Sequence, residues 1–315
     1  MELFNPRKLK INFSKYFKVF TIFSGVVSLA SLISIFTPGL NYGVDFRGGI
    51  EAQTIFKKEI SVETIREALD KKLKNILVVA FNDAPGVHEF SIKAQSDGKD
   101  NISQLLTSTL TEAFGATSEQ TWTVKKMDIV GPTVGASLKK SAILSLIFTC
   151  LLITFYIYWR FDLRFTPGAL ATIFHDLTFV TGLIVLSGME FSTTTVAALL
   201  TLVGYSINDT VVVYDRIREL ESKFLGKSKT ELVNFAVNST LSRTIMTAGA
   251  TLVACLVLYL VGGPAIQDFA LVLFVGIIIG TYSSIFVASP IYVWADKYFN
   301  EKPAAPQRKL TKART

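Results

Sequence analysis

The chain has 315 residues, half of them hydrophobic, and a formal net charge of +7. Its mean hydropathy is positive, which is more than a soluble domain needs to bury one core. The composition therefore excludes a wholly soluble protein. Most of the surplus Lys and Arg flanks apolar runs, where membrane topology and contact with anionic lipid account for it, so no nucleic-acid partner is expected.

Six apolar runs are long enough to cross a membrane. A hydrocarbon core of roughly 30 Å needs roughly 20 apolar residues in a helix. The runs lie at 19–37, 138–158, 168–186, 192–214, 241–261 and 269–294. The first run is too long for a signal peptide and no small-residue cleavage site follows it, so we expect an uncleaved anchor.

The distribution of Lys and Arg predicts the orientation, because these residues stay in the cytoplasm when they lie in short segments near a span. They gather in residues 1–18, in the second connection, in the loop 215–240 and in the tail 295–315, whereas the connections 188–191 and 262–268 hold none. Both termini are therefore expected in the cytoplasm. The segment 38–132 is expected on the other side of the membrane.

Segment 38–132 alternates between strand-like and helix-like patterns. Strands are predicted at 49–56, 76–81, 87–94 and 121–130, with a turn at 82–86. Helices are predicted at 62–73 and 102–114, with Ser61 and Asn101 as their N-caps. The order βαββαβ favours a small ferredoxin-like α+β domain. Its His88 has no second histidine or cysteine nearby, so a surface position is expected and no metal site.

Two further features have ordinary explanations. Cys150 and Cys255 fall in different spans and read as small apolar residues, so neither a disulfide nor a cofactor is expected. In the loop 215–240, Ser228 and Glu231 form a capping-box pattern ahead of apolar residues. This pattern predicts either an amphipathic helix at the membrane interface or an ordinary connecting helix.

Four ionisable residues lie within the apolar runs: His175, Asp176, Asp209 and Arg243. A charge near the bilayer centre costs roughly 2.5 to 3.5 kcal/mol, so such residues are rarely left without a partner or a purpose. Counted along the helices, all four fall in the cytoplasmic half of the bilayer, and one cluster is geometrically possible. Asn208 adds a polar neighbour beside Asp209.

The helical face of Arg243 continues through Thr247, Ala250 and Ala254, small residues that favour close helix packing, so this face is expected to point inward. One hypothesis is that Asp209 and Arg243 form an ion pair that only fixes helix register. Another is that Asp209 gains and loses a proton while Arg243 opposes the gain. The pair His175 and Asp176 fits either an auxiliary role or simple interhelical hydrogen bonding.

Small residues also occur in the sixth run, where Gly276 and Gly280 form a Gly-x-x-x-Gly pattern. This pattern is compatible with helices that slide, although it is also common in static bundles.

Four motifs match a known family. They are NYGVDFRGG at 41–49, GPTVGASL at 131–138, the pair His175-Asp176, and GYSINDTVVVYDRIRE at 204–219. With them, the chain resembles the SecF branch of the SecD/SecF family of bacterial protein-export membrane proteins. The resemblance runs from about residue 41 to residue 294.

The resemblance implies a multi-pass protein of the bacterial inner membrane with a periplasmic α+β domain, built like half of a transporter of the resistance-nodulation-division type. It implies SecD, the SecYEG channel and YajC as partners, an unfolded polypeptide as cargo, and the proton-motive force as energy source. The family's proton-coupling positions fall on Asp209 and Arg243. No enzymatic activity is implied. A passive scaffold and half of a small-molecule exporter remain the alternatives.

Overall fold

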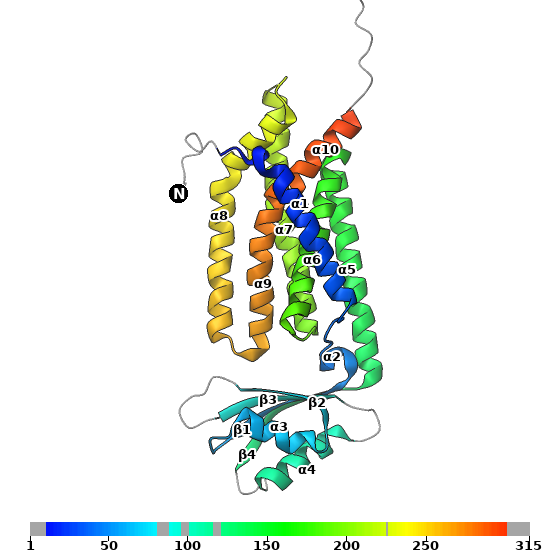
Figure 1. Ribbon diagram of the computed structural model, residues 1–315, viewed down its shortest axis with the longest axis vertical. Helices are drawn as coiled ribbons and strands as arrows, with labels where there is room; N and C mark the ends of the chain where they lie inside the picture. Colours follow the sequence, from blue (N-terminus) through cyan, green and yellow to red (C-terminus); the bar gives the residue numbers. More distant parts are fainter. Residues whose placement is uncertain (1–10, 81–87, 96–100, 116–120, 225, 301–315) are drawn as a thin grey trace, which may run out of the picture.

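The computed structural model describes residues 11–80, 88–95, 101–115, 121–224 and 226–300. A long helical bundle stands on a small α+β domain, which is inserted between the first two long helices (Figure 1). In the described chain, six helices are long and apolar enough to cross a membrane. They are Phe13–Phe36, Pro132–Arg160, Leu163–Leu186, Thr193–Lys223, Lys229–Val261 and Ile266–Phe299. The predicted fold of six spanning helices and one inserted domain is confirmed.

The spans are built from named elements. The first consists of the 3₁₀ helix η1 (Phe13–Tyr16) and α1 (Phe17–Phe36). The next four are α5 (Pro132–Arg160), α6 (Thr166–Ser187, preceded by η3, Leu163–Phe165), α7 (Thr193–Lys223) and α8 (Lys229–Val261). The last runs without a break through α9 (Pro264–Ser283), the π-helix η4 (Ser284–Ala288) and α10 (Ser289–Asn300).

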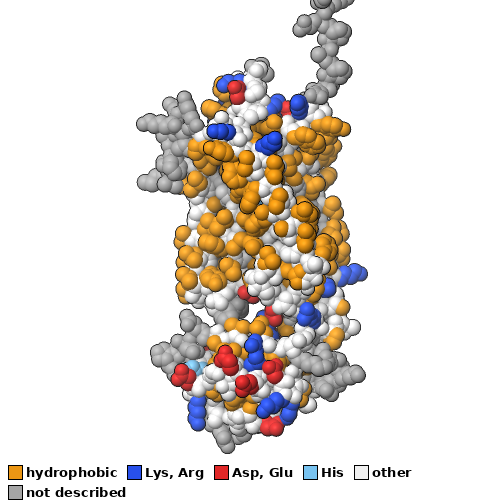
Figure 2. Space-filling view, in the orientation of Figure 1, with side chains coloured by type: hydrophobic (Ala, Val, Ile, Leu, Met, Phe, Trp, Pro, Cys, Tyr) orange, Lys and Arg blue, Asp and Glu red, His pale blue; other side chains and the backbone are white. Residues whose placement is uncertain are grey.

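On the face shown in Figure 2, apolar side chains cover the middle of the bundle, whereas charged side chains gather on the α+β domain and at the opposite end of the bundle. We call these two ends of the bundle the domain-side end and the far end. The described chain begins with η1 and finishes with α10 at the far end (Figure 1). This pattern is what a helix bundle needs when lipid surrounds its middle and water its ends.

The α+β domain has a four-stranded antiparallel sheet with strand order β2-β3-β1-β4. The strands are β1 (Gly49–Phe56), β2 (Lys74–Ala80), β3 (His88–Gln95) and β4 (Trp122–Val130). Helix α3 (Val62–Asp70) follows β1, and α4 (Ile102–Phe114) follows β3. The predicted order βαββαβ is therefore confirmed. The predicted turn at 82–86 and residue 87 lie outside the described residues.

Both helices cover the sheet face that points away from the bundle (Figure 1). Alternate strand residues such as Ile50, Phe90 and Trp122 pack there with Leu69 and Leu106 in one apolar core. This leaves the polar sheet face directed at the bundle.

The two predicted N-caps of the domain differ in outcome. Ser61 caps α3, because its hydroxyl accepts a hydrogen bond from the backbone N–H of Thr64 (3.2 Å). Asn101 occupies the predicted N-cap position of α4, but its side chain does not make the capping hydrogen bond. Its side-chain oxygen accepts from the hydroxyl of Ser103 (2.7 Å) and not from a backbone N–H.

Helices α6, α7 and α9 form the interior of the bundle, while α1, α5 and α8 present broad apolar surfaces to the surroundings. Helices α7 and α9 approach closely at two glycines. A Cβ at Gly276 would lie 2.7 Å from Leu202, and one at Gly280 would lie 3.0 Å from Ser206. The Gly-x-x-x-Gly pattern therefore serves as a packing surface for α7.

The loop 215–240 is not a separate amphipathic or connecting helix, which corrects the sequence-based expectation. Helix α7 continues to Lys223 and α8 already begins at Lys229, with Ser228 as its N-cap. The first turns of α8 bury Leu232, Val233, Ala236 and Val237 in the bundle core, so the span and the predicted helix are one continuous element.

An ion-pair network closes the far end. Arg164 contacts Glu221 (2.7 Å) and Asp296 (2.7 Å), and Lys229 pairs with both of these carboxylates. The phenol of Tyr292 also donates to Glu221 (2.6 Å). Because these groups come from η3 just before α6, the end of α7, the start of α8 and α10, the network fixes these helix ends relative to one another.

Candidate functional site

Three spans bring polar side chains together inside the bundle. We call this set the polar cluster: His175 and Asp176 on α6, Ser206 and Asp209 on α7, and Thr281 and Ser283 on α9. His175, Asp176, Ser206, Asp209 and Ser283 are all buried. Polar groups in such a place are costly unless they are paired or used, so the cluster is the natural candidate site.

Asp176 lies at the centre of a complete set of hydrogen bonds. The hydroxyls of Ser206 and Ser283 (2.9 Å) donate to its Oδ2, and Nδ1 of His175 lies 2.9 Å from its Oδ1. The carboxylate thus ties α6 to both α7 and α9. Since each of its oxygens has a partner, this geometry supports interhelical hydrogen bonding as the role of Asp176.

Asp209 has a different environment. Its side chain is only 3 % exposed, and its Oδ2 has no hydrogen-bond partner among the described residues. The hydroxyl of Thr281 lies beside it. The buried Thr281 Oγ1, the Tyr205 phenol oxygen and His175 Nε2 are likewise unpartnered in the described chain. A buried carboxylate oxygen without a donor favours uptake of a proton, because the neutral acid is cheaper to bury than the anion.

Arg243 is not in the polar cluster. Its charge acts on Asp209, but among the described residues no ion pair within 4.0 Å links Arg243 to a carboxylate. Its side chain is exposed, as are Thr247, Ala250 and Ala254 along the same face. The expectation that this face points inward is therefore wrong for the chain alone. The buried face of α8 carries Thr240, Thr244, Ala248 and Cys255 instead.

Asn208 is also exposed, although it is the neighbour of Asp209 in sequence. Thr201 and Gly204 lie at helical spacing before it on α7 and are exposed as well. We call these residues, with the exposed face of α8, the open face: Thr201, Gly204 and Asn208 of α7 and Arg243, Thr247, Ala250 and Ala254 of α8. Since the open face is small and polar at membrane depth, it is better suited to another helix than to lipid.

The sequence reasoning missed Thr281, Ser283 and Tyr205. A signal was present, because Thr281 to Ser284 is an unusually polar stretch in an otherwise apolar span. The stretch leads directly into the π-helix η4, a kind of helix irregularity that is frequent at functional sites. What the sequence could not supply is the meeting of this stretch with α6 and α7.

In the described part of the chain, no group of His, Cys, Asp and Glu has the spacing of a metal site. Cys255 is buried and Cys150 half-buried in separate spans. A carboxylate can bind and release a proton, which is the chemistry open to Asp176 and Asp209.

The family models that match the chain cover both of its parts. The model described as protein export membrane protein SecD/SecF, C-terminal, matches residues 110–298, and the SecD/SecF GG motif matches residues 33–57. Residues 33–57 include the end of α1 and the first strand of the domain. Together the two matches extend over most of the chain.

Curated relatives are similar over nearly the full length. The protein translocase subunit SecF of Rhodothermus marinus is 40 % identical over 300 residues, covering 93 % of this chain and 94 % of the relative. The protein translocase subunit SecF of Rickettsia bellii is 38 % identical over 300 residues, covering 94 % of this chain and 97 % of the relative. Relatives of this kind and the six apolar helices support a multi-pass protein of the inner membrane.

Two solved structures share the fold. The crystal structure of SecDF, a translocon-associated membrane protein from Thermus thermophilus, has a TM-score of 0.79 and 36 % identity, over 91 % of this chain. A crystal structure of SecDF in a super-membrane-facing form has a TM-score of 0.70 and 35 % identity, over 95 % of this chain. The chain spans only 39 % and 40 % of these two SecDF chains. On the combined matches in sequence and structure, the chain belongs to the SecD/SecF family of protein-export membrane proteins.

Proposed function

We propose that this chain is an auxiliary subunit of the Sec translocase that works with a SecD subunit and uses the proton-motive force to promote export of unfolded polypeptides. The observation that carries the proposal is Asp209, a buried carboxylate with one unpartnered oxygen beside the Thr281 hydroxyl. A carboxylate whose oxygens all accept hydrogen bonds is stabilised as the anion and gains little from protonation. Protonation of Asp209 is favoured because it removes a buried charge whose Oδ2 has no hydrogen-bond donor among the described residues.

The open face supports a partner subunit. It exposes an arginine and several small or hydroxyl-bearing residues on α7 and α8, next to spans whose remaining exposed surface is apolar. Leaving Arg243 in lipid costs roughly 2.5 to 3.5 kcal/mol, which a polar helix of another subunit would remove. In the SecDF chains this chain matches about two fifths of the length. The rest of those chains is the natural counterpart of a SecD subunit here.

The orientation follows from the charges at the two ends of the bundle. The far end carries the Lys- and Arg-rich connections, so it is assigned to the cytoplasm. The α+β domain is then periplasmic, where an exported polypeptide emerges. SecYEG and YajC are further proposed partners on the basis of the family alone.

In the proposed cycle, Asp209 alternates between two partners, the charge of Arg243 and a proton. When Asp209 is charged, it is attracted by Arg243 on the neighbouring helix. When a proton from the periplasm neutralises Asp209, this attraction ends and the two helices can shift against each other. One charge that crosses 100 mV supplies about 2.3 kcal/mol, which is comparable to the cost of burying one charged side chain.

The test measures late-stage export in inverted membrane vesicles that contain the chain with its SecD partner. Asp209→Asn and Arg243→Met are expected to lower the uncoupler-sensitive part of export by roughly tenfold or more, since each removes one side of a coupling worth about 2.3 kcal/mol. Asp215→Asn on the same helix is the matched control, because Asp215 is exposed at the far end. Wild-type export and wild-type uncoupler sensitivity in both variants would exclude the coupling role.

The alternative of a passive scaffold accounts for the hydrogen bonds of Asp176 but not for the environment of Asp209. If the whole chain were a passive scaffold, Asp209→Asn and Arg243→Met would reduce recovery of the complex and leave the proton dependence of export unchanged. The absence of an ion pair within 4.0 Å between these residues in the described chain already argues against a simple structural peg.

A further inference from the structure

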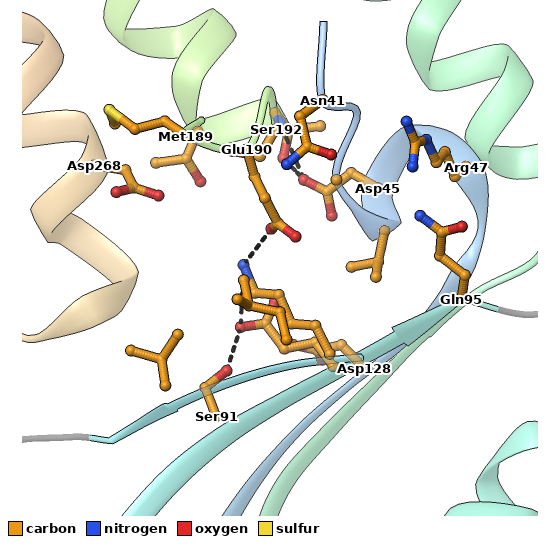
Figure 3. Close-up of a pocket in the computed structure, with 18 of the residues that line it drawn as sticks. Asn41, Asp45, Arg47, Ser91, Gln95, Asp128, Met189, Glu190, Ser192 and Asp268 are labelled. Carbon is orange, nitrogen blue, oxygen red and sulfur yellow. Dashed lines mark hydrogen bonds and ion pairs between the residues drawn. The ribbon is translucent and has the colours of Figure 1, made fainter. Parts of the chain in front are cut away.

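The segment of residues 41–49, which we call the joint, connects the first span to the sheet and touches the loop between α6 and α7 (Figure 3). The backbone N–H of Gly43 donates to the carbonyl of Phe191 (3.0 Å), and the N–H of Phe191 donates to the carbonyl of Asn41 (2.7 Å). Tyr42 is also covered by the ammonium group of Lys139 on α5, 3.7 Å from the ring centre. The joint therefore holds two spans and one loop at once.

Asp45 of the joint lies at the N-terminus of α7. Its Oδ2 accepts from the backbone N–H of Thr193 (2.9 Å) and from the Thr193 hydroxyl (2.6 Å). The N-cap Ser192 serves the N–H of Thr195 (3.3 Å), so Asp45 binds an N–H that the cap leaves free. A negative charge at this position is further stabilised by the helix dipole.

Helix α7 connects this contact to the polar cluster as one rod. It runs without interruption from Thr193 to Lys223 and carries Asp209 in its interior. At 1.5 Å per residue, Asp209 lies roughly 24 Å along the axis from Thr193. Any axial shift or tilt of α7 at Asp209 therefore reaches the carboxylate of Asp45.

The connection from the joint to the sheet is short. Asp45 lies in the short helix α2 (Val44–Arg47), and only Gly48 separates α2 from β1. Gly48 has a φ of +84°, and a Cβ at Gly49 would overlap the carbonyl oxygen of Ala94 on β3. Larger side chains do not fit at these two positions, and with so short a connection we expect α2 and the sheet to move together.

A second contact crosses the crevice between the sheet and the bundle, which has a volume of about 730 Å³. Lys93 of β3 pairs with Glu190 of the α6–α7 loop (3.0 Å) and approaches Glu51 of β1 (4.0 Å) (Figure 3). This contact links the same sheet to the same loop some distance from Asp45. The domain is thus attached at two separable points.

We propose that Asp45 is a positioning residue that couples α7 to the periplasmic sheet, with the Lys93–Glu190 pair as a second contact across the same crevice. This inference rests on the proposed function, because it supplies the path from Asp209 to the moving domain. The hydrogen bonds between Asp45 and Thr193 transmit movement of α7 in either direction. They join a backbone N–H of α7 directly to α2, the helix that leads into β1.

The test measures the position of the domain in proteoliposomes that contain the full chain with its SecD partner. Fluorophores are placed by Glu67→Cys on α3 and Val261→Cys at the domain-side end of α8, after replacement of Cys150 and Cys255. Glu67 and Val261 are both exposed. A proton gradient is expected to shift the energy transfer in the parent chain. Asp45→Ala should clearly reduce that shift, because only the Lys93–Glu190 pair and the backbone bonds of the joint then remain, and it should lower proton-driven export about tenfold, the order of a lost helix cap.

Asp45→Asn is the matched variant, because it keeps an oxygen that accepts from Thr193 and should retain most of both signals. A merely structural role would leave the gradient-dependent shift intact in every variant that assembles. The inference is overturned if Asp45→Ala keeps the parental shift and export, or if the parent shows no shift. If Asp209→Asn alone keeps proton-driven export, the proposed function fails as well, and the two failures are thus distinguishable.

Discussion

Two aspartates in the bundle differ in how their oxygens are paired, and this difference predicts different roles. Asp176 has donors on both oxygens, whereas Asp209 has an oxygen without a partner in the described chain. We therefore expect the first arrangement to hold helices together and the second to accept a proton. Burial alone would not separate them, since Asp176 is 1 % and Asp209 is 3 % exposed.

Replacing Asp176 by Ala should therefore destabilise the bundle. The hydroxyl of Ser206 would lose its acceptor, at about 1 to 3 kcal/mol for an unsatisfied buried group, while that of Ser283 would keep only the carbonyl of Gly280. The check is the unfolding free energy in detergent, with Asp209→Asn as the matched substitution. Asp209→Asn is expected to be neutral or stabilising, because it removes a buried charge. Equal destabilisation by both substitutions would contradict the division of roles.

Lys93 provides a prediction about pH. Burial lowers the pKa of Lys93, but the charges of Glu190 and Glu51 outweigh this effect, so its pKa lies above the ordinary value of 10.5. A raised lysine pKa means that the contact contributes fully below pH 10.5 and is lost as the pH rises through the higher value. The contact between Lys93 and Glu190 should therefore persist at pH 10 and be lost only at higher pH.

Energy transfer between the labels at positions 67 and 261 follows this titration. Lys93→Met should lack the alkaline step, and the exchanged pair Lys93→Glu with Glu190→Lys should restore attachment at neutral pH. Identical alkaline profiles for the parent and Lys93→Met would show that the pair does not hold the domain.

The sequence could predict which ionisable residues lie within the spans but not which of them face the interior of the chain's own bundle. Asp209 stands out because a carboxylate in an apolar run has few explanations. Arg243 was misplaced because small residues on a helix indicate close packing and do not distinguish the chain's own helices from those of a partner. The partners of Asp176 come from spans 30 and 107 residues away, which no local pattern encodes.

At the level of elements, helix α7 is the central rod of the molecule. It contacts α9 through two glycines, Asp45 through its N-terminus, and the far-end network through Glu221. The strands and helices of the inserted domain could be predicted well, because alternation and Ser61 are local signals. The continuity of α8 could not, because a capping box marks where a helix begins and does not show that it continues into the next span.

The packing of α9 on α7 gives a prediction at this level. Gly276→Leu should force Leu202 out of its position and cost about 1 to 3 kcal/mol through overpacking. Gly249→Leu on α8 is the matched control, because a Cβ at Gly249 has no heavy atom within 4 Å. Thermal unfolding of the purified chain compares the two. Similar stability in both variants would mean that α7 and α9 are not held at close distance.

For the whole molecule, the decisive property is that its polar interior is incomplete. The proposed function requires both Asp209 and Arg243. The described chain buries Asp209 in its interior but leaves Arg243 exposed on the open face. A helix of a second subunit laid against the open face would bury Arg243 as well. Helix α7 links the joint at its N-terminus to the open face further along the bundle. This link could not be predicted from the sequence, because the contact between Asp45 and Thr193 joins residues 148 positions apart.

Gly204 offers a way to test the open face without disturbing the fold. A Cβ at Gly204 meets no heavy atom within 4 Å, so Gly204→Phe should leave the stability of the isolated chain within about 1 kcal/mol. In the assembled membrane complex the ring would occupy the space of the partner's helix. Copurification of the SecD partner should therefore fall about tenfold or more, as expected for about 1.4 kcal/mol or more of steric cost. Gly249→Phe on α8, away from the named open-face residues, should retain the partner. Undiminished copurification with Gly204→Phe would place the subunit contact elsewhere on the bundle and leave Arg243 in need of another neighbour.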